Sequence, residues 1–388
     1  MTDSKEILKE LIRIPSYVDT KNHIDECKIG DYIYTFFKNL QKVDLTLNVE
    51  KQFVEKNRFN LLVYKGEPKI LLGFHMDTVP PHAENWKITE PFKPKEMSNK
   101  LFGRGSIDMK SQVAVMMSLT EELLPRLNNF YFLFTVDEEY DFKGILVFLE
   151  RINIKPSLII FCEPTDLKIS NMHRGIIQVR IAAYGKSAHA GTPKTGINAI
   201  ELLTESLKEV GGEIMANKFS DSNLGLCSFN FAYISGGQEG SYNCVPNKAM
   251  AVLDIRPTPK LTKDILEKII REKIRNKFKQ KCQENNLDFG ELFREPEINY
   301  DFIFGPLLTN KKDLEPLEKE VKQIIGGVEY TFSQGISEAG ILSEKLKVPA
   351  CNFGPGPKDL AHKPDEYVNL KDLKLFKDVL ANLLLKIS

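Results

Sequence analysis

A histidine and an aspartate stand together at the end of the apolar run 70–74 of this sequence. They are His75 and Asp77, and because they are two residues apart on an extended chain they share a face. A neutral imidazole binds a metal through one ring nitrogen while a carboxylate fixes the other nitrogen. Asp77 is therefore placed to orient His75 as a metal ligand, although the pair alone also fits a histidine in a surface turn.

Further carboxylates and a second histidine follow other apolar runs or precede a helical stretch. They are Asp108 before 109–124, Glu138 and Glu139 after 130–136, Glu163 after 158–162, and His362 in the loop after 348–353. Each one alone also fits a helix cap or a solvated loop. Together they indicate a site, because ligands of open α/β sheets gather at the carboxyl ends of the strands. A mixed set of imidazole and carboxylate ligands suits zinc, cobalt or manganese and argues against a thiolate site.

The four apolar runs that carry these residues predict strands of a mostly parallel sheet. Each run is apolar on both faces, as in strands that are buried beneath helices. Helical stretches separate the runs, notably 109–124, and a helix expected at 3–13 begins with Asp3 as its cap. The alternation of strands and helices predicts the α/β fold class.

The middle of the chain has a different pattern, which predicts a smaller α+β domain inserted into the larger one. Apolar and polar residues alternate at 178–183, 228–234 and 248–255, and helical stretches accompany them at 197–210 and 263–285. Such alternation is typical of antiparallel strands with one solvated face. We therefore expect the larger domain to comprise 1–173 and 299–388, with 174–298 as the insert.

Composition narrows the class of protein without indicating its chemistry. The 388 residues suffice for two or three domains, and the 53 basic residues balance the 53 acidic ones. We therefore expect no nucleic-acid partner. No apolar run reaches the ~18 residues of a membrane span, and the first ten residues lack the apolar stretch of a secretory signal. The six scattered cysteines are expected to be reduced thiols, so a cytoplasmic protein with no membrane partner is predicted.

The order of the motifs resembles the M20 family of metallopeptidases over about residues 70 to 368. The resemblance rests on His75-x-Asp77, the segment GRGSIDMK at 103–110, Asp137-Glu138-Glu139, Glu163-Pro164, the GPG at 354–356 with His362, and, in the insert, GKSAHAG at 185–191, NCVP at 243–246 and DIRP at 254–257. It implies a parallel-sheet di-metal hydrolase domain with an inserted lid or dimerisation domain.

The resemblance also implies a site for two divalent metal ions, zinc or cobalt above all. Asp108 would bridge the ions, His75 and Glu163 would complete one, and Glu139 and His362 would complete the other. The peptide bond after Asp108 is implied to be cis.

Catalytic and substrate-binding roles follow from the same resemblance. Glu138 would be the general base, and Asp77 would orient His75. In a homodimer, His189 would come from the lid of the partner subunit to stabilise the oxyanion. Asn243 and Arg256 would contact the substrate. Arg256 would hold the substrate carboxylate through its fork of donors. We expect His189, Asn243 and Arg256 to form one substrate face, since all three lie in the insert.

Two late segments resemble the acetylornithine deacetylase subgroup: AHKPDEY at 361–367 and SEA at 337–339. The implied reaction is hydrolysis of the amide of an N-acyl amino acid, most specifically N-acetylornithine, in arginine biosynthesis. Succinyl-diaminopimelate desuccinylase, aminoacylase and dipeptidase activities share the metal site and stay open. A non-catalytic binding module with this fold is a further alternative, against which the presence of all five ligands and Glu138 argues. No G-x-S-x-G motif supports a serine hydrolase.

Overall fold

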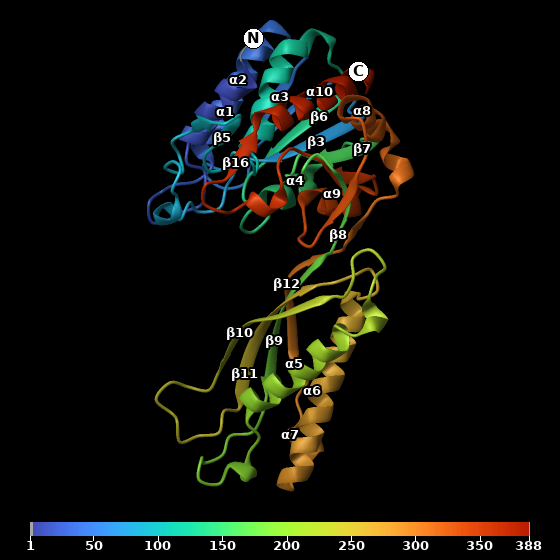
Figure 1. The fold of residues 1–388 in the computed structure, drawn as a ribbon. Helices are drawn as coiled ribbons and strands as arrows, with labels where there is room; N and C mark the ends of the chain where they lie inside the picture. The colour runs from blue at the N-terminus through green and yellow to red at the C-terminus, as the bar shows by residue number, and fades with distance from the viewer. Residues whose placement is uncertain (1–2, 388) are drawn as a thin grey trace. The chain divides into compact units, whose positions relative to one another are not determined.

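The chain forms two compact units in a computed structural model that describes residues 3–387. The larger unit comprises the described part of Met1–Met172, Leu307–Phe332 and the described part of Ser337–Ser388. The smaller unit comprises His173–Pro306 with Ser333–Ile336, coloured from green to orange in Figure 1. That these units act as a catalytic domain and a lid stays a prediction.

Within residues 3–387, the larger unit is built around a nine-stranded sheet in the order β1-β2-β6-β3-β7-β15-β8-β13, with β14 pairing β8. The strands are β1 (Asn48–Phe53), β2 (Phe59–Lys65), β3 (Ile70–His75), β6 (Phe130–Thr135), β7 (Leu158–Phe161), β8 (Ile169–His173), β13 (Leu307–Leu308), β14 (Tyr330–Ser333) and β15 (Ala350–Asn352). The four central strands β6, β3, β7 and β15 run parallel, so their carboxyl ends meet at one edge. The predicted α/β fold with a mostly parallel central sheet is confirmed, and the four central strands arise from the four apolar runs.

Helices cover both faces of this sheet (Figure 1). They are α1 (Ser4–Arg13), α2 (Cys27–Val43), α3 (Lys110–Leu123), α8 (Glu315–Ile325) and α10 (Leu370–Ile387) on one face, and α4 (Lys143–Arg151) and α9 (Glu338–Leu346) on the other. Asp3 caps α1 as predicted, because its side chain accepts a hydrogen bond from the backbone N–H of Lys5 at 3.1 Å.

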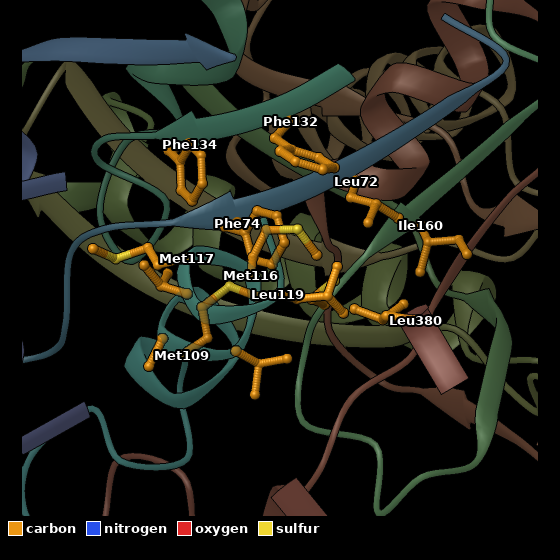
Figure 2. Close-up of a cluster of buried hydrophobic side chains, with 14 of the residues drawn as sticks. Leu72, Phe74, Met109, Met116, Met117, Leu119, Phe132, Phe134, Ile160 and Leu380 are labelled. Atoms are coloured by element: carbon orange, nitrogen blue, oxygen red, sulfur yellow. The ribbon is translucent and has the colours of Figure 1, made fainter. Parts of the chain in front are cut away.

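The core between the sheet and α3 consists of alternate strand residues and one helix face (Figure 2). Leu72 and Phe74 of β3 point toward α3, where Met116 and Leu119 pack against them. Full burial of each such side chain stabilises the fold by roughly 1.5–3 kcal/mol. This packing fixes β3 and α3, the two elements that flank His75 and Asp108.

A three-stranded sheet in the order β16-β5-β4 also belongs to the larger unit. Its strands are β4 (Lys95–Met97), β5 (Lys100–Phe102) and β16 (Tyr367–Asn369). β16 pairs antiparallel with β5, with Tyr367 opposite Phe102. This pairing joins a segment just after His362 to a segment just before Asp108, although the two are more than 260 positions apart in the sequence.

The smaller unit contains an antiparallel sheet in the order β10-β11-β9-β12, as the alternating patterns predict for three of its strands. The elements are β9 (Ile176–Tyr184), β10 (Ser228–Gly236), β11 (Lys248–Arg256), β12 (Glu297–Phe304), α5 (Ala199–Ile214), α6 (Lys263–Asn285) and α7 (Phe289–Leu292). α5 and α6 bury their apolar faces against this sheet. Because β12 pairs with β9, the unit continues to Pro306 rather than ending near residue 298.

In the part of the chain that the structure describes, no helix is long and apolar enough to cross a membrane.

Candidate metal centre

The residues singled out at the strand ends lie around Asp108 in the larger unit. Nε2 of His75, the last residue of β3, lies 2.9 Å from Oδ1 of Asp108. Nε2 of His362 lies 3.2 Å from the other oxygen, Oδ2, and 2.9 Å from Oε1 of Glu139. Each oxygen of Asp108 therefore faces a different histidine, which is the arrangement that a carboxylate between two metal ions requires.

The ligand atoms of three of these residues form a compact group. One ligand atom from each of His75, Asp108 and Glu139 lies within 4.8 Å of the other two. The peptide bond between Asp108 and Met109 is cis, as the resemblance implies.

Asp77 joins His75 to the turn that carries the two glutamates. Nδ1 of His75 lies 3.1 Å from the carbonyl oxygen of Asp77 and 3.5 Å from its Oδ1. The Asp77 carboxylate accepts the backbone N–H of Glu138 at 3.2 Å and that of Glu139 at 2.8 Å. Asp77 is therefore positioned to orient the imidazole, and it also fixes the backbone of both glutamates.

A buried charged triad that the sequence patterns do not reveal supports the same turn. Asp137 has a left-handed backbone, with φ +68°, and its Oδ1 accepts a hydrogen bond from Nη2 of Arg58 at 2.5 Å. Glu26 accepts Arg58 Nε at 2.7 Å and the backbone N–H of Asp137 at 2.9 Å. The triad holds an uncommon backbone conformation directly before Glu138.

Glu163 reaches the site from the loop after β7. Its Oε1 is buried and has no hydrogen-bond partner among residues 3–387. The loop after β15 packs directly on this segment: a Cβ on Gly354 would lie 2.5 Å from the carbonyl oxygen of Glu163. Only glycine permits that approach, so the first glycine of the GPG segment brings the loop of His362 beside the loop of Glu163.

The carboxylates of this site are crowded, and their pKa values show it. Burial, with repulsion from Asp108, raises the pKa of Glu163 to about 7. Burial and repulsion from Glu163 raise the pKa of Glu138 well above its ordinary value. Burial and Asp108 likewise raise the pKa of Glu139. The described residues around these three carboxylates do not supply enough positive charge to balance their negative charge.

The two histidines supply the positive charge that faces Asp108. Hydrogen bonds to Asp108 and Glu139 raise the pKa of His362 to about 10. Burial of His75 opposes its protonation, but hydrogen bonds to Asp108 and Asp77 outweigh burial and raise its pKa well above the usual range. Burial of Asp108 favours its neutral form, yet His362 and His75 outweigh that effect and hold its pKa below the usual range.

This donor set fits divalent metal ions. It combines imidazole nitrogens with carboxylate oxygens, the ligands that zinc and cobalt accept, and it leaves a buried carboxylate oxygen of Glu163 without a partner among the described residues. Metal ions would also supply the positive charge that the crowded carboxylates need, in exchange for protons on the histidines.

Glu338 is a further buried carboxyl group near this edge of the sheet. It begins α9, is fully buried, and accepts a hydrogen bond from Oγ1 of Thr135, the last residue of β6, at 2.7 Å. Burial raises its pKa well above the ordinary value. The sequence pattern SEA contains this residue, but nothing in the pattern indicates contact with β6.

The smaller unit places the expected substrate-binding residues in two locations. The backbone N–H of Ala190, next to His189, donates to the carbonyl oxygen of Asn243 at 2.8 Å, and both His189 and Asn243 are exposed. Arg256 lies at the opposite end of β11 from them, roughly 26 Å along the strand at ~3.3 Å per residue.

The expected single substrate face of His189, Asn243 and Arg256 therefore stays a prediction, and it requires residues from two protomers. The guanidinium of Arg256 already donates hydrogen bonds to Asp254, from Nε to Oδ1 at 2.9 Å and from Nη2 to Oδ2 at 3.2 Å.

We predict that His75→Ala and His362→Ala each remove about one of two bound metal ions, because each deletes a ligand on a different side of Asp108. Metal analysis after dialysis measures the loss. His82→Ala is the matched control, because the His82 side chain is 68% exposed and lies outside the centre. Unchanged metal content in either ligand variant would remove that histidine from the set.

Comparison with known proteins shows the family of this chain. The model of peptidase family M20/M25/M40 matches residues 71–386. An acetylornithine deacetylase of Buchnera aphidicola is 30% identical, covering 97% of this chain and 96% of that protein. A tripeptidase of Staphylococcus aureus has the same fold, with a TM-score of 0.71 at 18% identity, over 99% of this chain and 97% of that one.

A dinuclear metal-binding M20 peptidase of Bacillus subtilis also has this fold, with a TM-score of 0.66 at 14% identity, over 99% of this chain and 97% of that one. The family match covers most of the chain and includes every residue of the candidate centre. The chain therefore belongs to peptidase family M20/M25/M40, and it is an amidohydrolase of that family.

Proposed function

We propose that this enzyme removes the acyl group from an N-acyl amino acid, most specifically the acetyl group of N-acetylornithine in arginine biosynthesis. The observation that carries the hydrolytic part is Asp108, whose two oxygens face His75 and His362 separately. The near full-length similarity to an acetylornithine deacetylase supports the choice of substrate. Location in the cytoplasm stays a prediction from the sequence.

We assign two divalent ions, zinc or cobalt, to the centre. Asp108 would bridge them, with His75 and Glu163 completing one ion and Glu139 and His362 completing the other. The Oε1 of Glu163, which has no partner among the described residues, and the dinuclear site named for the Bacillus subtilis relative support this assignment. When bound, such ions polarise the amide carbonyl and lower the pKa of water.

Glu138 is the proposed general base. Its backbone is fixed by Asp77, which accepts the Glu138 N–H, and a carboxylate is a suitable proton acceptor for water. It would take a proton from the attacking water and deliver a proton to the nitrogen of the leaving amine. Asp77 would hold the orientation of His75 during this cycle.

The residues of the smaller unit would bind substrate as part of a homodimer. β10 is an end strand of its sheet, and Tyr233 and Ile234 on it are 53% and 40% exposed. An end strand with exposed apolar side chains is a natural surface for pairing with a second copy. His189 and Asn243 lie at one end of β11 and Arg256 at the other, which favours contributions from two protomers to one site.

In this proposal His189 of one protomer stabilises the oxyanion at the other protomer's centre, and Asn243 contacts the substrate. Arg256 would bind the substrate carboxylate through its guanidinium group. Because that group now pairs with Asp254, substrate binding would have to share or replace this hydrogen bonding.

Hydrolysis of a panel of substrates tests the proposed function. Metal-loaded enzyme is expected to release ornithine from N-acetylornithine with a kcat/KM at least ~10-fold above that for N-succinyl-diaminopimelate, other N-acyl amino acids and dipeptides. Glu138→Gln, purified in the same way, excludes a contaminating hydrolase. A higher kcat/KM for another member of the panel would replace the substrate, and hydrolysis of none would favour a binding module.

Mixing two inactive variants tests the dimer. His189→Ala and Glu138→Gln are each expected to lose at least ~10²-fold in activity, because one lacks the oxyanion donor and the other the base. After dissociation and reassociation together, each mixed dimer has one intact site, so activity should return. Each variant reassociated with itself is the control. Mixed dimers that form but stay inactive would contradict the transfer of His189 between protomers.

A further inference from the structure

Arg104 and Glu366 form a buried ion pair in the larger unit, next to the candidate metal centre. Nη1 of Arg104 lies 2.5 Å from Oε2 of Glu366, and each side chain is 1% exposed. Removing two charges from water costs several kcal/mol per ion, so a buried pair is weak evidence for stability. A role in positioning the nearby groups of the candidate metal centre would explain why this pair is buried.

The pair has a particular spacing from the proposed metal ligands. Arg104 precedes Asp108 by four residues, and Glu366 follows His362 by four residues. The two segments 104–108 and 362–366 are therefore joined at both ends. Arg104 contacts Glu366 at one end, and Nε2 of His362 lies 3.2 Å from Oδ2 of Asp108 at the other.

Further hydrogen bonds attach the His362 segment to the Arg104 segment. Nη1 of Arg104 also donates to the carbonyl oxygen of Lys363, directly after His362, at 3.4 Å. The backbone N–H of Gly103 donates to the carbonyl oxygen of Glu366 at 3.2 Å. β16, which follows Glu366, pairs with β5, which precedes Arg104.

Arg104 is itself firmly held. Its Nη2 donates to the carbonyl oxygens of Pro81 at 3.3 Å and Pro80 at 3.4 Å, and its guanidinium lies 5.3 Å from the centre of the Trp86 ring. These contacts hold Nη1 and Nη2, whereas Nε of Arg104 has no hydrogen-bond partner among the described residues. Through Nη1, Arg104 in turn holds Oε2 of Glu366.

His362 is less enclosed than His75. Its side chain is 51% exposed, and its backbone is left-handed, with φ +67°. That conformation is uncommon for residues other than glycine, although histidine adopts it more often than most residues. His75, by contrast, is 1% exposed and ends a central strand.

We propose that Arg104 and Glu366 are positioning residues that hold His362 against Asp108, and so serve one of the two metal ions selectively. The inference rests on the proposed two-metal function. It concerns the ion assigned to Asp108, Glu139 and His362. The ion on the His75 side depends on β3 instead and should not need the pair.

Calorimetric titration of the metal-free full-length protein with Co²⁺ tests this inference. The wild type is expected to bind two ions. Arg104→Met is expected to weaken one of them 10- to 100-fold, as loss of a partner outside the ligand set typically does. The weakened ion should be the one lost in His362→Ala, and the other should bind as in the wild type. Lys65→Met, which removes a partly buried ion pair with Asp44 outside the centre, is the matched control and should titrate like the wild type.

Two further variants separate positioning from general stability. In Arg104→Met the charge of Glu366 is buried without its partner, so the melting temperature of the metal-free protein should fall below that of the metal-free wild type. The double variant Arg104→Met/Glu366→Met removes both charges, so its melting temperature should return to that of the metal-free wild type. The double variant should still bind the ion on the His362 side weakly. Glu366→Gln, which keeps the shape and an acceptor oxygen, should show a smaller loss of affinity than Arg104→Met.

Three results would overturn the inference. They are a wild-type affinity of Arg104→Met for the ion on the His362 side, an equal weakening of both ions, or a wild-type affinity of the double variant for both ions. If any of these occurs while the wild type binds two ions and hydrolyses the N-acyl substrate, the positioning role fails and the proposed function stands. A wild type that binds fewer than two ions would overturn the two-metal assignment and the positioning role, and the substrate panel would still decide the proposed hydrolysis.

Discussion

The concentration of carboxylates around Asp108 is the constraint on which the larger unit depends. Glu138, Glu139 and Glu163 approach one another and Asp108 at the carboxyl edge of the sheet, and burial together with this crowding raises their pKa values. Buried negative charges that lie close together are stable only when positive charge lies between them. The proposed divalent ions would supply that positive charge, in exchange for protons on the two histidines.

The rest of the unit supplies rigid positions for these groups. The parallel strands bring His75, the glutamate turn and Glu163 to one edge, and the core beneath α3 fixes the strands. Hydrogen bonds and ion pairs then hold the irregular segments: Asp77 and the triad with Arg58 hold the glutamate turn, and Arg104 with Glu366 attaches the loop of His362. Regular structure thus gives the approximate location, and buried charged contacts give the final placement.

The sequence predicts the parts of this arrangement that follow from local patterns. Continuous apolar runs predicted the central strands, and the residues after them, such as His75 and Glu163, could be placed at one edge. The triad and the Arg104–Glu366 pair could not be predicted, because contacts between distant segments leave no periodic pattern. The pairing of Asp254 with Arg256 was readable in principle, since residues two apart on a strand share a face. His189 and Arg256 are 67 positions apart in the sequence, and only the register of β9 against β11 places them toward opposite ends of that sheet.

The most direct test of the central claim is anomalous X-ray diffraction from crystals grown with zinc, recorded above and below the zinc absorption edge. We predict two anomalous peaks roughly 3.5–4 Å apart, one beside each oxygen of Asp108, with His75 and Glu163 at one and Glu139 and His362 at the other. A single peak, no peak, or peaks away from Asp108 would contradict the account.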